Sequence, residues 1–136
     1  MRRQIAVFTI VLCAVSTSSY AQQCLHGQGE TVEQATRRRE ALTATRLVNT
    51  IQLHQFAKLR TYLRHTELAP FASTRGTDFL KRLSLNPDED VVPGWTLTLN
   101  LTENGYWLMI RDKTDPCGFA FIANQEGVIF TAEPIR

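Results

Sequence analysis

Residues 31–65 contain neither glycine nor proline, and this stretch constrains the fold more than any other part of the chain. Thr31 and Gln34 form a capping-box pattern, which is typical of a helix N-terminus. Apolar residues then recur near the 3.6-residue period of an α-helix, at Ala41, Ala44, Val48, Ile51, Phe56, Leu59 and Leu63. We therefore predict one long amphipathic helix from Thr31 to about His65.

The second half of the chain has the two-residue period of β-strands instead. Apolar and polar residues alternate strictly through Trp95–Leu101, which indicates a strand with one buried face. Asn104–Gly105 is the preferred central pair of a type I′ hairpin turn, because both positions need positive φ. A two-residue loop there pairs Leu99 with Ile110, so the apolar residues of the two strands coincide.

A second hairpin follows in the sequence. Phe119–Ala123 and Val128–Ala132 are apolar and flank the polar stretch Asn124–Gly127. A four-residue loop pairs Phe121 with Phe130 and directs both side chains toward the core. The sequence therefore predicts two consecutive hairpins, which form a four-stranded antiparallel meander.

Between the long helix and the strands, Thr77–Leu85 has the pattern of a short second helix. The fold class that results is α+β, with a long N-terminal α-helix packed on a four-stranded antiparallel β-meander. A chain of 136 residues has the usual length of one domain.

The predicted registers also place four apolar side chains on the sheet face away from the long helix. Antiparallel sheets usually show water a more polar face, so this face is either covered or used for contact. The covering alternative is the N-terminal segment, residues 22–29. The functional alternative is a protein partner, and its candidate contact residues are Trp107, Met109, Ile122 and Ile129.

Residues 1–21 have the three parts of a secretory signal peptide. Arg2 and Arg3 precede the apolar run Ile5–Val15, and the small residues around Ala21 fit the cleavage rule. As a retained anchor, the run of 11 residues would span only about 16 Å of a hydrocarbon layer about 30 Å thick. We predict a mature single domain of residues 22–136, periplasmic or secreted, with no stable membrane span.

Cleavage removes Cys13 and leaves Cys24 and Cys117. Two cysteines in an oxidising compartment pair by default, so we predict a structural disulfide between them. Free thiols are one alternative. A redox-active pair is another, although the C-x-x-C spacing is missing.

Charge and motifs indicate neither nucleic-acid binding nor catalysis. Without Arg2 and Arg3, basic and acidic residues balance at 13 each, whereas nonspecific nucleic-acid binding needs clustered positive charge. The three histidines have no zinc-ligand spacing, and no G-x-S-x-G or P-loop motif occurs. We expect no enzyme activity, no catalytic residue, no metal and no cofactor.

Three stretches, Glu40–Gln55, Pro93–Leu99 and Cys117–Ile129, occur in an order that resembles the globular head of type IV pilins and type II secretion pseudopilins. The resemblance covers Thr36–Ile135. It implies a long helix lying across an antiparallel sheet, and it offers no catalytic residues to transfer. The prepilin leader and the apolar N-terminal half-helix of that family are not expected here, so polymerisation does not carry over.

The resemblance implies an exported, non-catalytic structural or interaction module, accessory to an envelope or filament system. Its expected partner is a protein of the cell envelope. The alternative function is a stand-alone periplasmic ligand-binding or inhibitor domain. That alternative predicts a deep pocket between helix and sheet, lined by Tyr62, His65 or Tyr106.

Overall fold

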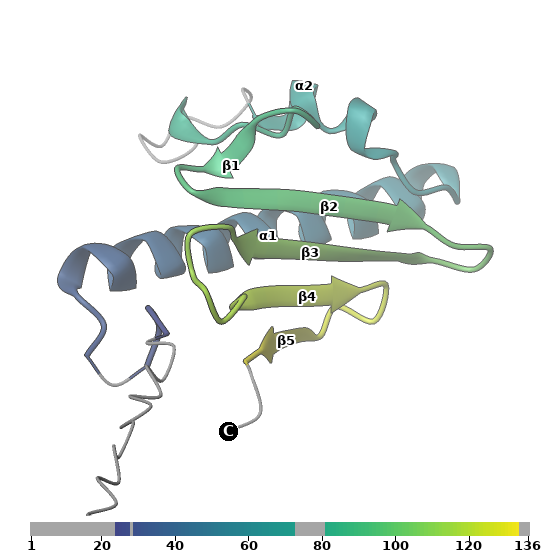
Figure 1. The fold of residues 1–136 in the computed structure, drawn as a ribbon. Helices are drawn as coiled ribbons and strands as arrows, with labels where there is room; N and C mark the ends of the chain where they lie inside the picture. The colour runs from purple at the N-terminus through teal and green to yellow at the C-terminus, as the bar shows by residue number, and fades with distance from the viewer. Residues whose placement is uncertain (1–23, 28, 73–80, 134–136) are drawn as a thin grey trace, which may run out of the picture.

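One long helix lies across a five-stranded antiparallel sheet in the computed structural model, which describes residues 24–27, 29–72 and 81–133 (Figure 1). The strands are adjacent in chain order, from β1 to β5. The elements are α1 (Val32–Leu59), a 3₁₀ turn η1 (His65–Glu67), α2 (Ala69–Ala72), β1 (Asp90–Val92), β2 (Trp95–Leu101), β3 (Tyr106–Asp112), β4 (Ala120–Asn124) and β5 (Ile129–Ala132). The predicted α+β class, a long helix on an antiparallel meander, is confirmed. Strand β1 was not predicted.

Two sequence predictions fall wholly or partly outside the described residues. The predicted signal peptide, residues 1–21, lies entirely outside them. So does the first part of the predicted second helix, residues 77–80. Lys81 and Arg82 are helical, and the chain leaves the helix before Leu83.

The start of α1 is set by the predicted capping box. The Gln34 backbone N–H donates to Thr31 Oγ1 at 3.2 Å, and the Thr31 backbone N–H donates to Gln34 Oε1 at 2.8 Å. The helix ends earlier than predicted, at Arg60, whose φ of 56° is left-handed. The side-chain amide of the buried Gln52 donates to the Leu63 carbonyl and accepts from the Leu63 backbone N–H, both at 2.8 Å, so the chain folds back on the helix after Arg60.

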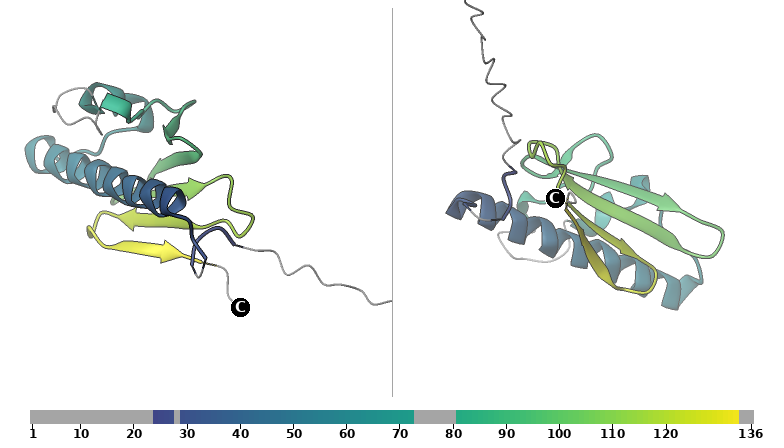
Figure 2. Two further views of the ribbon diagram at one scale, coloured as in Figure 1. Left: turned by 90° about the vertical axis from the view of Figure 1, so that its left-hand side faces the viewer. Right: turned by 60° about the horizontal axis from the view of Figure 1, so that its bottom comes forward.

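The core lies between α1 and one face of the sheet. Ala41, Ala44 and Val48 are fully buried on the helix, and their small side chains allow a close approach to the strands. Trp95 is the largest fully buried side chain, and its ring stacks on that of Phe121. The opposite sheet face carries no helix of the described part of the chain (Figure 2).

The register between β2 and β3 differs by two residues from the prediction. Leu99 lies opposite Leu108 rather than Ile110. Because side chains alternate with a period of two, this shift leaves every residue of both strands on its predicted face. The prediction of which β2 and β3 side chains face the helix is therefore correct despite the error in pairing.

The predicted type I′ turn at Asn104–Gly105 is wrong. Neither residue has positive φ, and the Thr102 backbone N–H donates to the Gly105 carbonyl at 2.9 Å. A Cβ added to Gly105 would lie 2.7 Å from the side chain of Gln125. Gly105 therefore lies close to the side chain of Gln125 in the neighbouring hairpin, and it does not mark a type I′ turn.

The register between β4 and β5 differs by one residue, which has larger consequences. Phe130 lies opposite Ile122, not opposite the predicted Phe121. The turn is closed by the Gly127 backbone N–H, which donates to the Asn124 carbonyl at 3.0 Å, and Gly127 has a φ of 79°. This is the pattern of a three-residue loop that ends in a left-handed glycine. One residue fewer in the loop reverses the face of every β5 side chain.

Candidate functional site

An apolar patch lies on the sheet face away from α1, and we call it the outer patch: Trp107, Met109, Ile122 and Phe130. In the register, Met109 lies opposite Ile122, and Ile122 lies opposite Phe130. Trp107 is two residues from Met109 on the same strand and therefore shares its face. Trp107 is 39% exposed and Phe130 is 54% exposed, while the other two side chains are half-buried.

Ile129, the fourth residue of the predicted contact set, does not belong to this face. It lies opposite Ala123 in β4 and packs against the core on the helix side. The cause is the three-residue loop, which exchanges the faces of Ile129 and Phe130. Phe130 was not predicted on this face for the same reason. Gly127 is the sequence signal for the shorter loop that places it there.

Charged and polar side chains border the outer patch. Thr98 and Asn100 lie beside it on β2, and Asn124 lies opposite Trp107 on β4. Arg111 is exposed on the same face, two residues beyond Met109. The outer patch therefore has the apolar centre and polar rim that are usual for protein interfaces.

The described part of the N-terminal segment does not cover this face. We call residues 24–30 the strap. The ring of His26 packs against Phe119 and Trp95, at centroid distances of 4.5 and 5.4 Å. Both aromatic rings belong to the core, so the described residues of the strap lie at the end of the sheet on the helix side.

The strap carries a buried cluster of charged groups that the sequence analysis did not identify. His26 Nδ1 lies 2.7 Å from Glu30 Oε1, and Nε2 lies 2.8 Å from Asp112 Oδ2. The His26 side chain is 2% exposed. Arg38 on α1 donates two hydrogen bonds of 2.8 Å to the Glu30 carboxylate. The cluster joins the strap to both α1 and β3.

The two carboxyl groups of the cluster are held in their ionised form. The hydrogen bonds from Arg38 outweigh the opposing effect of burial and, with those from His26, lower the pKa of Glu30 from 4.5 to about 2. At Asp112, burial opposes ionisation, but hydrogen bonds from Thr114 and His26 outweigh it and lower the pKa. When both ring nitrogens of His26 are protonated, each can donate to one of these carboxylates.

The lowered pKa of Glu30 predicts a specific pH dependence. Its contribution to the free energy of unfolding is complete above about pH 4.5 and is lost as the pH falls toward about 2. The stability difference between wild type and Glu30→Gln should therefore be largest above pH 5 and should shrink in acid. Urea denaturation of both proteins between pH 7 and pH 2.5 measures this difference. A difference that grows in acid contradicts the assignment.

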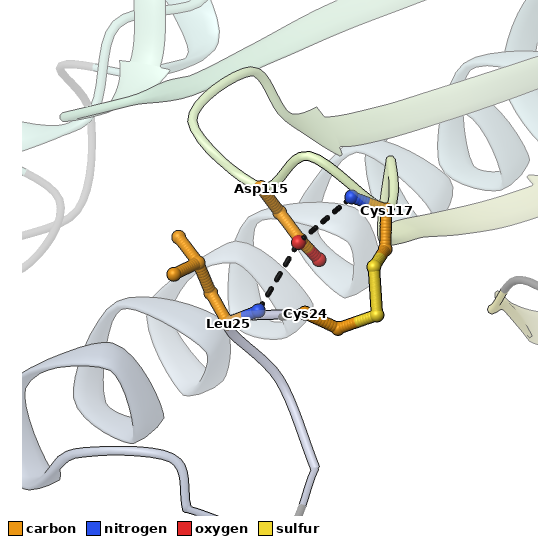
Figure 3. Close-up of a disulfide and its surroundings, with 4 residues drawn as sticks. All are labelled: Cys24, Leu25, Asp115 and Cys117. Carbon is orange, nitrogen blue, oxygen red and sulfur yellow. Dashed lines mark hydrogen bonds between the residues drawn. A yellow bond between two sulfur atoms is a disulfide. The ribbon is translucent and has the colours of Figure 1, made fainter. Parts of the chain in front are cut away.

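The predicted disulfide is present, and an aspartate connects its two sides (Figure 3). Cys24 and Cys117 are bonded across 93 positions of sequence. One carboxylate oxygen of the buried Asp115 accepts hydrogen bonds from the backbone N–H groups of Leu25, at 3.1 Å, and Cys117, at 3.0 Å. The strap is thus fixed covalently and by hydrogen bonds at the same place.

The pocket that would favour a ligand-binding function is only partly formed by the residues named for it. Tyr62 lines a surface cavity of about 310 Å³ at the end of α1, but neither His65 nor Tyr106 lines it. Tyr106 is buried, its hydroxyl donates to Asn49, and burial raises its pKa. His65 is half-buried at the start of η1, and burial lowers its pKa.

Two larger hollows adjoin along the first turns of α1, with volumes of about 530 and 350 Å³. They share Glu33, Arg37 and Pro93 in their walls. Arg37 donates to Glu33 at 2.6 Å, so the cation that both hollows share is already paired. The geometry of these hollows gives no preference for a particular ligand.

The described residues were compared with the geometry of metal sites and with the requirements for a membrane-spanning helix. No group of three or more His, Cys, Asp or Glu side chains in that part of the chain is placed to hold a metal ion. None of the described helices combines the length and apolarity needed to span a bilayer.

Comparison with known proteins gives no relatives: no protein-family model, no curated protein and no solved structure matches this chain.

Proposed function

We propose that this chain is an exported, non-catalytic interaction module with a pilin-like head, and that the outer patch contacts its protein partner. The observation that carries the proposal is the patch itself. An indole and a phenyl ring lie exposed on a sheet face that no described element covers. Aromatic residues and methionine are enriched in the centres of protein interfaces.

The fold supports the pilin-like part of the proposal, since a long helix across an antiparallel meander is compatible with a pilin head. The Cys24–Cys117 disulfide supports an extracytoplasmic location, because such bonds persist in oxidising compartments. We propose a periplasmic or secreted protein, accessory to an envelope or filament system.

The test removes the two exposed aromatic rings from the outer patch. The variant Trp107→Ser with Phe130→Thr should lose its partner in cross-linking and affinity capture from the native envelope. Its melting temperature should stay within about 2 °C of wild type, because substitutions of exposed side chains usually change stability little. Capture followed by mass spectrometry, with a thermal melt of the same samples, measures both quantities.

A matched control removes exposed apolar side chains elsewhere. Val32 and Leu59 on α1 are 83% and 65% exposed. The variant Val32→Thr with Leu59→Ser should keep the partner. Equal capture by the outer-patch variant and this control contradicts the proposal. A fall of several degrees in the melting temperature of the outer-patch variant also contradicts it, because it would show that the face is core.

A further inference from the structure

We infer that the outer patch is self-complementary and that the protein it binds is a second copy of this chain. The inference rests on the proposed function, since it names the partner of the same face. It is carried by the register of the sheet and by the position of one exposed cation, and the area of the face sets the expected strength of association.

The register places the apolar and charged groups symmetrically about one row of the sheet. Met109, Ile122 and Phe130 form a row across three adjacent strands. On β3, Trp107 lies two residues before this row and Arg111 two residues after it, and all face the same side. The Cα atoms of Trp107 and Arg111 are therefore at about equal distances from the row, on opposite sides of it, and the Arg111 guanidinium lies beside Gly118 at the end of the sheet.

A two-fold rotation about an axis parallel to this row places a second copy face to face with the first, with unlike groups opposite each other. Two copies that pack face to face, with their β3 strands antiparallel, bring Arg111 of each copy over Trp107 of the other. An arginine over an indole face is a favourable cation–π pair, and it forms twice. The apolar row packs against its own copy at the centre, where the sheets are about 10 Å apart.

Arg111 is available for this contact. It is exposed, and among the described residues it has no carboxylate within ion-pairing distance. By contrast, the neighbouring Lys113 is paired with Asp90 at 2.7 Å. The turns at the Trp107 end of the sheet carry Glu103 and Glu126. In the proposed dimer, Arg111 of the second copy therefore lies near the acidic end of this face.

The area of the face predicts a weak dimer. Four strands of up to seven residues give a face of roughly 400 Å² per copy, from a strand spacing of about 4.8 Å and a rise of about 3.4 Å. A buried total of about 800 Å² lies below the range of about 1,200–2,000 Å² for stable interfaces. We therefore expect reversible association at high micromolar concentration.

The test is analytical ultracentrifugation of the exported, oxidised protein from 5 to 500 µM. Wild type should shift from monomer to dimer within this range. Arg111→Glu removes the cation, and Trp107→Arg places cations against each other, so each single variant should weaken association at least tenfold. Leu59→Ser, on the helix, is the matched control and should associate like wild type.

The double variant, Trp107→Arg with Arg111→Glu, distinguishes the proposed dimer from other modes of association. The two introduced charges are opposite and meet only across the two-fold axis, because the positions lie about 13 Å apart within one strand. Association should recover to within about threefold of wild type. Failure to recover overturns the geometry, and a wild type that stays monomeric at 500 µM overturns the inference. If envelope capture still depends on Trp107 and Phe130 in that case, the proposed function stands without the dimer.

Discussion

Replacing Cys24 and Cys117 together by serine should lower the free energy of unfolding of the oxidised protein by about 4 kcal/mol. The disulfide joins residues 93 positions apart, so it closes a long loop and restricts the unfolded chain strongly. A domain of this size has a total stability of about 5–15 kcal/mol, so the loss is a large part of it.

Urea denaturation of wild type and the double-serine variant measures this loss. Wild type treated with a reductant serves as the control and should lose the same amount, because it lacks the same covalent link. A loss below about 1 kcal/mol in both samples would contradict the chain-entropy account, in which the disulfide stabilises the fold by restricting the unfolded chain.

Replacing His26 by alanine should cost about 3–5 kcal/mol, because it removes a buried hydrogen-bonding partner of two carboxylates and empties the space that the ring fills. The substitution leaves the carboxylates of Glu30 and Asp112 without the ring nitrogens that face them at 2.7 and 2.8 Å. It also leaves a gap beside Trp95 and Phe119. Thermal and urea denaturation at pH 7 measure the change.

A triple variant separates charge from packing. His26→Leu with Glu30→Gln and Asp112→Asn fills much of the space and removes both carboxylate charges. It should recover most of the stability that the alanine variant loses, because the penalty comes mainly from the buried hydrogen-bonding partner that each carboxylate loses. If the triple variant is as unstable as His26→Ala, packing against the aromatic rings dominates.

Local sequence patterns predicted those parts of the fold that depend on neighbouring residues. The capping box at Thr31 needs only Gln34, three positions away, and it forms as predicted. The alternation through Trp95–Leu101 follows from the two-residue period of a strand, and it identified the buried face of β2 correctly. Pairing of Cys24 with Cys117 needed only a count of cysteines and the expected compartment.

The errors arose where contacts distant in sequence decide the outcome. The helix ends at Arg60 because Gln52 binds Leu63, and nothing in the helical period indicates this contact. In the second hairpin, strand periodicity fits a three-residue loop as well as a four-residue one. The left-handed conformation of Gly127 selects the shorter loop and moves Phe130 to the outer face.

The charged cluster of the strap was missed for a similar reason. His26 and Asp112 are 86 positions apart, and each looks like an ordinary surface residue in the sequence. Only the fold brings them together. Trp107 and Met109 were placed on the correct face because the error in the first hairpin was an even number of residues.

The hydrogen bonds of Asp115 imply an order of assembly. Its bond to Cys117 spans two positions and forms once the connection between β3 and β4 folds, whereas its bond to Leu25 spans 90. Local hairpins form faster than contacts between distant segments. We therefore expect the loop that holds Asp115 to fold first and the strap to bind to it afterwards. On this order, the Cys24–Cys117 bond forms after the sheet, and folding of the sheet does not depend on oxidation.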